Sequence, residues 1–269
     1  MKLEIIVSTM NQRVYQTIDK FSQYASEDVL VTIIHQVTNG SIYDLDIPEG
    51  NIRCLNCPSI GLPQSRNFGL KHAMGDFIIP TDDDITLVSG FYSIVKNSID
   101  THPSAHGFTY KIQAEDSEEE FKHYHNKGFK HNSLSLAKVS SIELCISRQF
   151  LNERNLIWDE DFGLGTTFPG GLEVVFLQDC FRKNAIIYYE PQYFVLHPLE
   201  SSGKIVSKEK ISLRASVFLR SFGWLKGTLF ILAFYFKKRK MFSDKSISLS
   251  QYFVSSLNGI KDFYSWSKR

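Results

Sequence analysis

The fold class is indicated most clearly by the segment Asp76-Phe77-Ile78-Ile79-Pro80-Thr81-Asp82-Asp83-Asp84. Its apolar part is typical of a buried strand, and it passes directly into three consecutive aspartates. Carboxylates held a few ångströms apart raise one another's pKa and destabilise a fold unless a positive charge lies between them. Hard carboxylate oxygens suit Mg²⁺ or Mn²⁺, so a divalent cation at this strand end is favoured over the alternative, a solvated acidic turn.

The residues before this stretch alternate between strand-like and helix-like segments. The apolar patterns predict strands at 3–8, 29–34, 51–55 and 76–80, with helices at 11–24 and 62–73. Such alternation favours right-handed βαβ units, and therefore an α/β, Rossmann-like fold with a mostly parallel central sheet flanked by helices. Ligands of such sheets bind outside the carboxyl ends of the strands, which is where the aspartates stand.

The later part of the chain is less regular. Residues 113–132 are polar and predict a solvated insertion, in which His123 and His125 are exposed loop histidines. Strands are then predicted at 143–147, 185–189 and 193–196, and a helix at 172–183. A boundary near 202–204 divides a catalytic domain, 1–205, from a helical, aromatic extension, 206–269.

Composition excludes several classes of protein. The 30 basic and 29 acidic side chains give a formal net charge of only +1, which argues against a nucleic-acid partner. No signal-peptide pattern precedes the first strand, and no uninterrupted apolar run reaches the roughly 18–20 residues of a membrane span. Cys54 and Cys57 form a lone CxxC without further metal ligands, so we expect ordinary free thiols and a cytoplasmic protein.

Several motifs, taken in order, resemble the family 2 glycosyltransferases of the GT-A fold. Residues 64–78, QSRNFGLKHAMGDFI, are similar to the segment that leads into the DxD element of that family. Residues 158–165, WDEDFGLG, resemble its acceptor-side stretch, and residues 168–177, FPGGLEVVFL, resemble the helix start that holds its catalytic base. His197 resembles the late histidine of the family. The ordered combination over residues 1–205 is specific although each piece alone is not.

The resemblance implies a role for each matching residue. Glu173 would be the general base, and Asp84, Asp82 and His197 would hold Mn²⁺ or Mg²⁺. The residues implied for the nucleotide sugar are Ser8, Thr9, Gln36, Arg66, Asn67, Asp82 and Asp83. Those implied for the acceptor side are Trp158, Asp159 and Glu160. The nucleotide-sugar half would span about residues 1–112 and the acceptor half about 134–205.

The chain departs from the family pattern at two places. Leu172 stands where an acid usually precedes the base, and Glu173 replaces the usual Asp but keeps a carboxylate on a longer stem. The second strand ends in His35-Gln36, where the family often has an acidic turn. Structural alternatives stay open: Glu173 as a partner of the helix dipole, His197 as a buried structural histidine and Arg66 as a surface cation.

Residues 217–240 form an apolar, aromatic segment that ends in Lys237-Lys238-Arg239-Lys240. Because Gly223 and Gly227 interrupt the segment, we do not expect it to span a membrane. Apolar surface beside four cations favours peripheral contact with an anionic membrane, here the inner face of the plasma membrane. The alternative is a helix packed on the catalytic domain with a solvated basic turn.

The sequence thus favours an inverting glycosyltransferase that moves a sugar from a UDP-sugar to a hydroxyl of a glycan or lipid-linked oligosaccharide, in cell-surface polysaccharide biosynthesis. One alternative is a metal-dependent nucleotidyltransferase, but the glycine-rich loop expected after its first strand is replaced by Ser8-Thr9-Met10-Asn11-Gln12. The other is an inactive nucleotide-sugar-binding module, which only Leu172 favours.

Overall fold

Four parallel strands form the N-terminal half of the protein, described here by a computed structural model that covers residues 1–115, 120–198, 207–244 and 247–268. The central strand β1 (Leu3–Met10) pairs with β2 (Val29–Gln36) and β4 (Phe77–Asp82), and β3 (Ile52–Cys57) pairs with β2. Among the described residues the sheet has nine strands, in the order β3-β2-β1-β4-β8-β6-β9-β5, and β7 pairs with β9.

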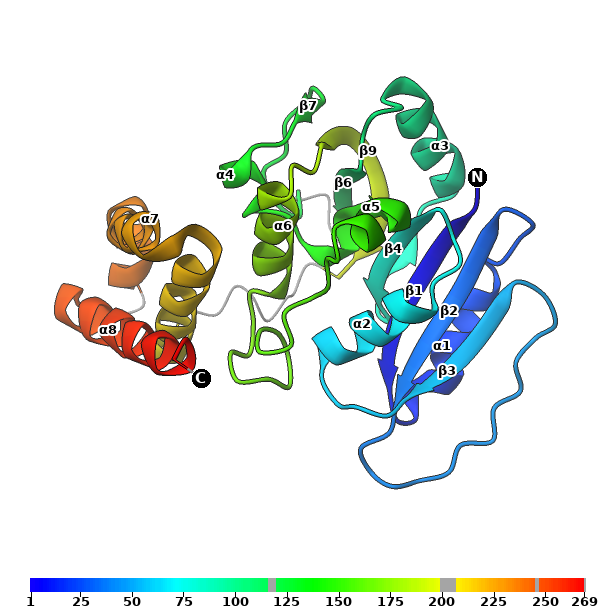
Figure 1. The fold of residues 1–269 in the computed structure, drawn as a ribbon, viewed down its shortest axis with the longest axis horizontal. Coiled ribbons are helices and arrows are strands. Elements are labelled where there is room, and N and C mark those ends of the chain that lie inside the picture. The colour runs from blue at the N-terminus through cyan, green and yellow to red at the C-terminus, as the bar shows by residue number, and fades with distance from the viewer. Residues whose placement is uncertain (116–119, 199–206, 245–246, 269) are drawn as a thin grey trace.

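Helices cover both faces of this parallel part (Figure 1). The odd-numbered side chains of β1 pack with α1 (Arg13–Ser22), whereas Ile6 points to the opposite face and packs with Leu70 of α2 (Leu62–His72). A Cβ atom on Gly69 would lie 2.4 Å from Ile6 Cγ2, so α2 approaches the sheet more closely than a larger residue permits. This close approach brings the side chains of α2 to the carboxyl edge of the sheet.

The second half of the sheet is mixed. Its elements are β5 (Thr86–Leu87), α3 (Phe91–Thr101), β6 (Gly107–Ala114), β7 (Phe129–Lys130), α4 (Ser133–Leu136), a 3₁₀ helix (Ser141–Glu143), β8 (Leu144–Ser147), α5 (Arg148–Glu153), α6 (Leu172–Arg182) and β9 (Ile187–His197). Strand β8 runs antiparallel to both β4 and β6, while β9 is parallel to β6. The parallel pairing expected from the sequence therefore holds for the first half and for β6 with β9.

Two sequence-based expectations are corrected in this half. The strands expected at 185–189 and 193–196 are one strand, β9, whose register with β6 shifts near Pro191 because proline has no N–H to donate to the ladder. The insertion is only partly solvated, because polar groups satisfy one another inside it. Tyr124 is buried and donates to Glu143 at 2.6 Å, and the buried His131 bonds Thr109 at 2.7 Å. His123 and His125 are exposed, as expected.

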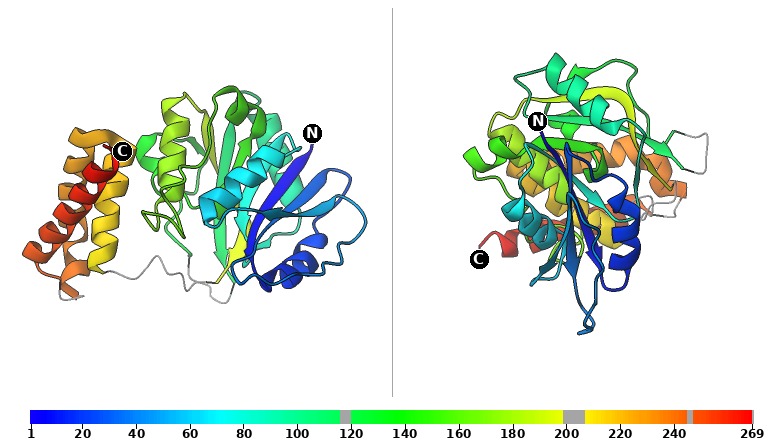
Figure 2. Two further views of the ribbon diagram at one scale, coloured as in Figure 1. Left: turned by 60° about the horizontal axis from the view of Figure 1, so that its bottom comes forward. Right: turned by 90° about the vertical axis from the view of Figure 1, so that its right-hand side faces the viewer.

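Two further helices form a separate layer beyond α6 (Figure 2). They are α7 (Lys208–Asp244) and α8 (Leu249–Trp266). Gly223 has non-helical torsions of φ 76° and ψ 172°, and there α7 folds back on itself. The Phe218 and Phe234 rings are 6.0 Å apart, whereas a continuous helix would separate these positions by about 24 Å. The extension is therefore a bundle of two α7 arms and α8.

The first arm of α7 packs on the α/β part of the protein. Val217 and Leu219 share a buried cluster with Phe162, Phe168 and Val175. Among the described residues, one helix, Lys208–Lys240, is long and apolar enough to cross a membrane by length and composition, but the fold-back divides it. The domain boundary expected near 202–204 lies outside the described residues. All four cysteines are free, and burial raises the pKa of Cys54 to about 11, as suits unreactive thiols.

Candidate active site

The carboxyl ends of β1, β2 and β4 meet at one edge of the sheet. Ser8 lies beside Asp82 in the pairing of β1 with β4, and Ser8 also lies beside Ile34, close to the end of β2. The three consecutive aspartates begin at this edge with Asp82. The strand pairing therefore places most of the predicted nucleotide-side residues in one region, as the βαβ pattern predicts.

The three aspartates have different partners. Asp83 is nearly buried, accepts a 2.7 Å hydrogen bond from the Thr9 hydroxyl and pairs with Arg13 of α1. Asp82 accepts from Arg66 Nη2 at 3.1 Å. The Asp84 side chain is 51% exposed, with His197 Nε2 3.8 Å from its Oδ1. Two of the three carboxylates are thus neutralised by arginines, so like-charge repulsion alone does not require a metal between all three.

Arg66 connects the aspartates to the predicted base. Its side chain is 0% exposed, and its Nη1 donates to Glu173 Oε1 at 3.0 Å. The three residues come from α2, β4 and the first turn of α6. A charged side chain is almost never fully buried without paired partners, which the two carboxylates provide here. Arg66 is therefore a central ion-pair residue of the site and not a surface cation.

Neighbouring charges and burial change the proton affinity of this cluster. Burial raises the pKa of Asp82; Arg66 lowers it, and the carboxylates of Glu173 and Asp84 raise it further. Burial also raises the pKa of Asp83, against the lowering effects of the Thr9 hydrogen bond and of Arg13. The net effect raises the pKa of both groups, and any cation bound nearby would lower it.

His197 places one imidazole nitrogen beside Asp84. Its Nδ1 lies 2.7 Å from the Pro198 carbonyl oxygen, which can only accept, so Nδ1 donates there, and Nε2 lies 3.8 Å from Asp84 Oδ1. Within the described residues no group of three or more His, Cys, Asp or Glu side chains is placed to hold a metal. Asp84 and His197 supply two potential ligands, so a cation there would need its other ligands from substrate phosphates and water.

The remaining nucleotide-side candidates are engaged with the protein. Ser8 Oγ accepts from Ser65 of α2 at 2.8 Å. The Gln36 side-chain amide donates to the carbonyl oxygens of Ser59 and Gly61, which fixes the turn before α2. These contacts position the edge of the sheet.

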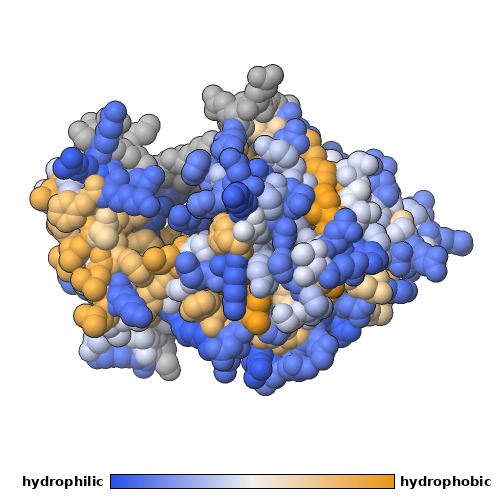
Figure 3. Space-filling view, turned by 90° about the horizontal axis from the view of Figure 1, so that it is seen from above, coloured by the Kyte–Doolittle hydropathy of each residue, from blue (hydrophilic) through white to orange (hydrophobic). Residues whose placement is uncertain are grey.

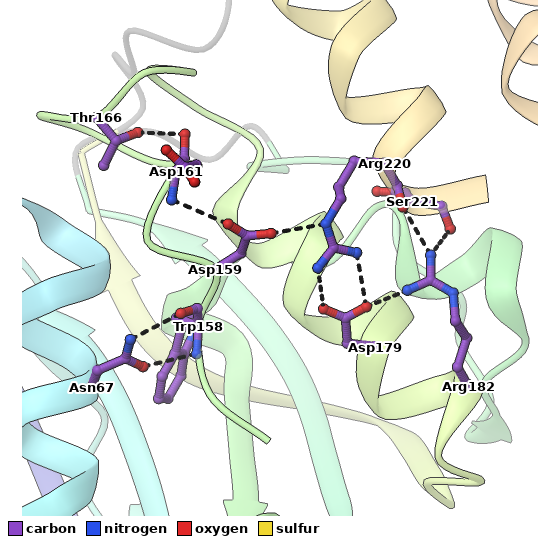
Figure 4. Close-up of polar contacts among 9 residues, drawn as sticks. All are labelled: Asn67, Trp158, Asp159, Asp161, Thr166, Asp179, Arg182, Arg220 and Ser221. Atoms are coloured by element: carbon purple, nitrogen blue, oxygen red, sulfur yellow. Dashed lines mark hydrogen bonds and ion pairs between the residues drawn. The ribbon is translucent and has the colours of Figure 1, made fainter. Parts of the chain in front are cut away.

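Asn67 is joined to the acceptor-side segment instead of the strand end. Its Nδ2 donates to the Trp158 carbonyl at 2.9 Å, and its Oδ1 accepts from the Trp158 amide at 2.8 Å (Figure 4). The same Nδ2 donates to Glu160 Oε1 at 3.1 Å. The Trp158 ring is buried and stacks on Phe176 at 4.2 Å. Trp158 thus supports the segment from inside, and Glu160 is the more exposed of the two.

Asp159 binds the C-terminal bundle. It accepts from Arg220 Nε of α7 at 2.8 Å, and the same guanidinium makes a bidentate pair with Asp179 of α6 at 2.8 and 3.0 Å (Figure 4). Arg182 donates to the Arg220 carbonyl and pairs with Asp179. The sequence analysis did not identify Arg220. A single arginine in an otherwise apolar stretch was the available signal, because such a charge needs buried partners.

Half of the chain matches a known protein family. The sequence model described as Glycosyl transferase family 2 matches residues 25–159, half of the chain. The chain belongs to glycosyl transferase family 2. It is accordingly a glycosyltransferase, as the motifs predicted. No curated protein matches the sequence.

Solved structures share the fold of this family 2 enzyme. S. aureus TarS 1–349, also solved in complex with UDP-GlcNAc, is 16% identical with a TM-score of 0.65, over 98% of this chain and 80% of that chain. The Pyrobaculum calidifontis mannosyltransferase PcManGT, in complex with GDP-Man and Mn²⁺, is 13% identical with a TM-score of 0.54, over 82% of this chain and 63% of that chain. At this identity the likeness concerns the fold, and the expected GT-A-like α/β fold with a C-terminal helical region is confirmed.

Proposed function

We propose that this enzyme transfers a sugar, with inversion, from a UDP-linked donor to a hydroxyl of a glycan or lipid-linked oligosaccharide, in cell-surface polysaccharide synthesis. The Arg66 bridge is the observation that supports this most directly, because it brings Glu173 to the strand-end aspartates. The donor would lie on residues 1–112 and the acceptor on 134–205. Structural neighbours bind UDP, UDP-GlcNAc or GDP-Man, which agrees with a nucleotide-linked donor.

Glu173 is suited to act as the general base. Arg66 donates a hydrogen bond to Glu173 Oε1, whereas Glu173 Oε2 has no hydrogen-bond partner in the described part of the chain. This oxygen takes the proton of the acceptor hydroxyl as the hydroxyl oxygen bonds to the anomeric carbon. The bond from that carbon to the diphosphate breaks at the same time, and the nucleoside diphosphate leaves with the electron pair. Attack from the face opposite the leaving group inverts the anomeric centre.

Asp84 and His197, with Asp82 nearby, would hold the divalent cation. A cation bound there neutralises charge on the diphosphate, and Mn²⁺ and Mg²⁺ both suit these donors. Leu172 does not favour an inactive binding module, because its side chain is buried in the hydrophobic core and packs against Gly163. Family membership disfavours a nucleotidyltransferase.

The donor assignment is tested by thermal unfolding with UDP, GDP, dTDP and CDP, each with and without Mn²⁺. We expect UDP with Mn²⁺ to raise the unfolding midpoint by about 5–10 °C at a concentration near 100 times its Kd. Asp84→Asn should abolish the shift, whereas Asp100→Asn, a change at an exposed carboxylate of α3, should retain it. The proposal would be contradicted if none of the four nucleotides raised the unfolding midpoint, or if Asp84→Asn showed the same rise as the wild type.

The second part of this proposal is that the enzyme binds the cytoplasmic face of the membrane through the C-terminal bundle. The second arm of α7 exposes an apolar stripe that faces one side because its spacing follows the helical repeat: Leu225, Leu229, Leu232 and Phe236. The exposed cations of residues 237–240 follow directly. Figure 3 shows apolar side chains gathered over the C-terminal bundle. An apolar stripe beside cations complements an anionic bilayer.

Vesicle flotation tests this surface. We expect the enzyme to float with phosphatidylglycerol vesicles at low salt, and to float less with phosphatidylcholine vesicles or in high salt, because screening weakens the contribution of residues 237–240. The double substitution Leu225→Ser with Leu229→Ser should reduce binding at least tenfold, and Ile42→Ser, at an exposed apolar residue far from the bundle, should not. Equal binding by both variants, or self-association without vesicle binding, would overturn the membrane assignment.

A further inference from the structure

A groove of about 1030 Å³ lies between the loop that precedes α6 and the C-terminal bundle. Residues 167–169 form one wall. The first turns of α7 and the inner side of α8 form the other. No residue so far assigned to the donor, the metal or the base lines this groove.

The groove presents hydroxyl and amide groups. Its lining includes Ser212, Ser250, Gln251, Asn258 and Ser265. Ser250 and Gln251 already bond to Ser248 in the N-terminal cap of α8. The hydroxyl and amide groups of the other three can both donate and accept hydrogen bonds, which matches the hydroxyl groups of sugars. The charged residues along it have both signs, two lysines with Glu209 and Asp262, so they do not select strongly for an anion.

Trp266 adds an aromatic surface at one end of the groove. It is half-buried, and the rings of Phe162 and Phe168 hold it at 5.7 and 5.9 Å. The negative face of an indole attracts the slightly positive C–H groups of a sugar ring. Polar hydrogen-bonding groups combined with one fixed aromatic ring form a surface suited to a carbohydrate.

The groove is close to the candidate base. Pro169 precedes Glu173 by four residues, which span at most about 14 Å even when fully extended. Side chains of the first α7 arm reach the same loop, because Leu213 Cδ2 lies 3.0 Å from where a Cβ would stand on Gly170. The groove lining ends at Pro169, four residues before Glu173, so a glycan bound there is within reach of the start of α6.

We propose that this groove binds the part of the acceptor glycan that precedes the reacting sugar, so that the C-terminal bundle completes an acceptor site of neutral, polyhydroxylated character. The inference rests on the proposed role of Glu173 for its connection to catalysis, although binding in the groove does not require turnover. A chain that presents one hydroxyl to Glu173 would extend along the loop between residues 167 and 169 and into the bundle.

The test uses the full chain and an array of oligosaccharides of four to eight residues taken from bacterial surface polysaccharides, both neutral and anionic. We expect the wild type and Glu173→Gln to bind a common set of neutral glycans. Asn258→Trp, which fills the groove, should weaken that binding at least tenfold. Leu257→Trp is the matched control, because Leu257 is the exposed neighbour on α8 that does not line the groove.

Glycan binding by the two tryptophan variants distinguishes the possible results. Loss of binding in Asn258→Trp with an unchanged unfolding midpoint, together with binding in Leu257→Trp, supports the groove. Absence of glycan binding across the array, preference for anionic glycans alone, or equal binding by both tryptophan variants overturns it. If Asn258→Trp unfolds, Trp266→Ala replaces it with the same expected loss. Nucleotide binding without glycan binding rejects only the groove, whereas glycan binding without nucleotide binding rejects the proposed donor chemistry.

Discussion

Replacement of Glu173 with glutamine is expected to lower kcat for sugar transfer by about 10²–10⁴-fold, the usual contribution of a general base. Glutamine has nearly the same shape, and its Oε1 can still accept the Arg66 hydrogen bond, but it cannot take a proton from the acceptor. Donor binding should therefore persist. Steady-state transfer kinetics, together with the nucleotide-dependent rise in unfolding midpoint, separate the two effects.

Glu160→Gln is the control for this result. Glu160 is a second carboxylate on the acceptor side, but its Oε1 accepts from Asn67, and we expect a much smaller decrease in kcat from its replacement. If Glu173 only complements the dipole of α6, Glu173→Gln will lose less than about 1 kcal/mol of stability and keep its transfer rate. That outcome, or a larger loss of kcat in Glu160→Gln, would reject Glu173 as the base.

Arg66→Met is expected to destabilise the fold by about 3 kcal/mol, because it leaves two carboxylates facing each other without their shared cation. The value is at the lower end for a broken buried pair, since Asp82 and Glu173 keep partial contact with water. Transfer activity should also fall, because the orientation of Glu173 is lost. Urea unfolding measures the free energy, and transfer kinetics at a temperature where the variant is folded measure the activity.

Two further variants make the Arg66 result specific. The double change Arg66→Met with Glu173→Gln removes one of the repelling charges. Its loss of unfolding free energy should therefore be smaller than the sum of the losses in the two single variants. Arg13→Met removes an arginine from Asp83, but the Arg13 side chain is 60% exposed, and we expect a loss below about 1 kcal/mol. Additive single effects, or equal losses from Arg66→Met and Arg13→Met, would contradict a coupled buried pair.

Sequence patterns were sufficient to predict the strands and helices that carry the site, and the edge of the sheet at which it lies. The apolar run before Asp82 is β4, the β-branched run from Val29 is β2, and the expected helices at 62–73 and 172–183 are α2 and α6. Periodicity predicts such elements because each depends on neighbours within a few residues along the chain. The parallel order then places the aspartates at a carboxyl edge, whatever the distant contacts are.

The side chains that meet across the site follow from the packing of elements that are distant in sequence. Arg66 and Glu173 are 107 residues apart, and their ion pair exists because α2 and α6 converge on the same strand end. The Asp159 contact with Arg220 and the fold-back of α7 at Gly223 likewise depend on how the bundle packs against α6. A residue's type and local spacing give the bonds it can form. Its actual partner is set by the packing of elements distant in sequence, for which a single sequence contains no periodic signal.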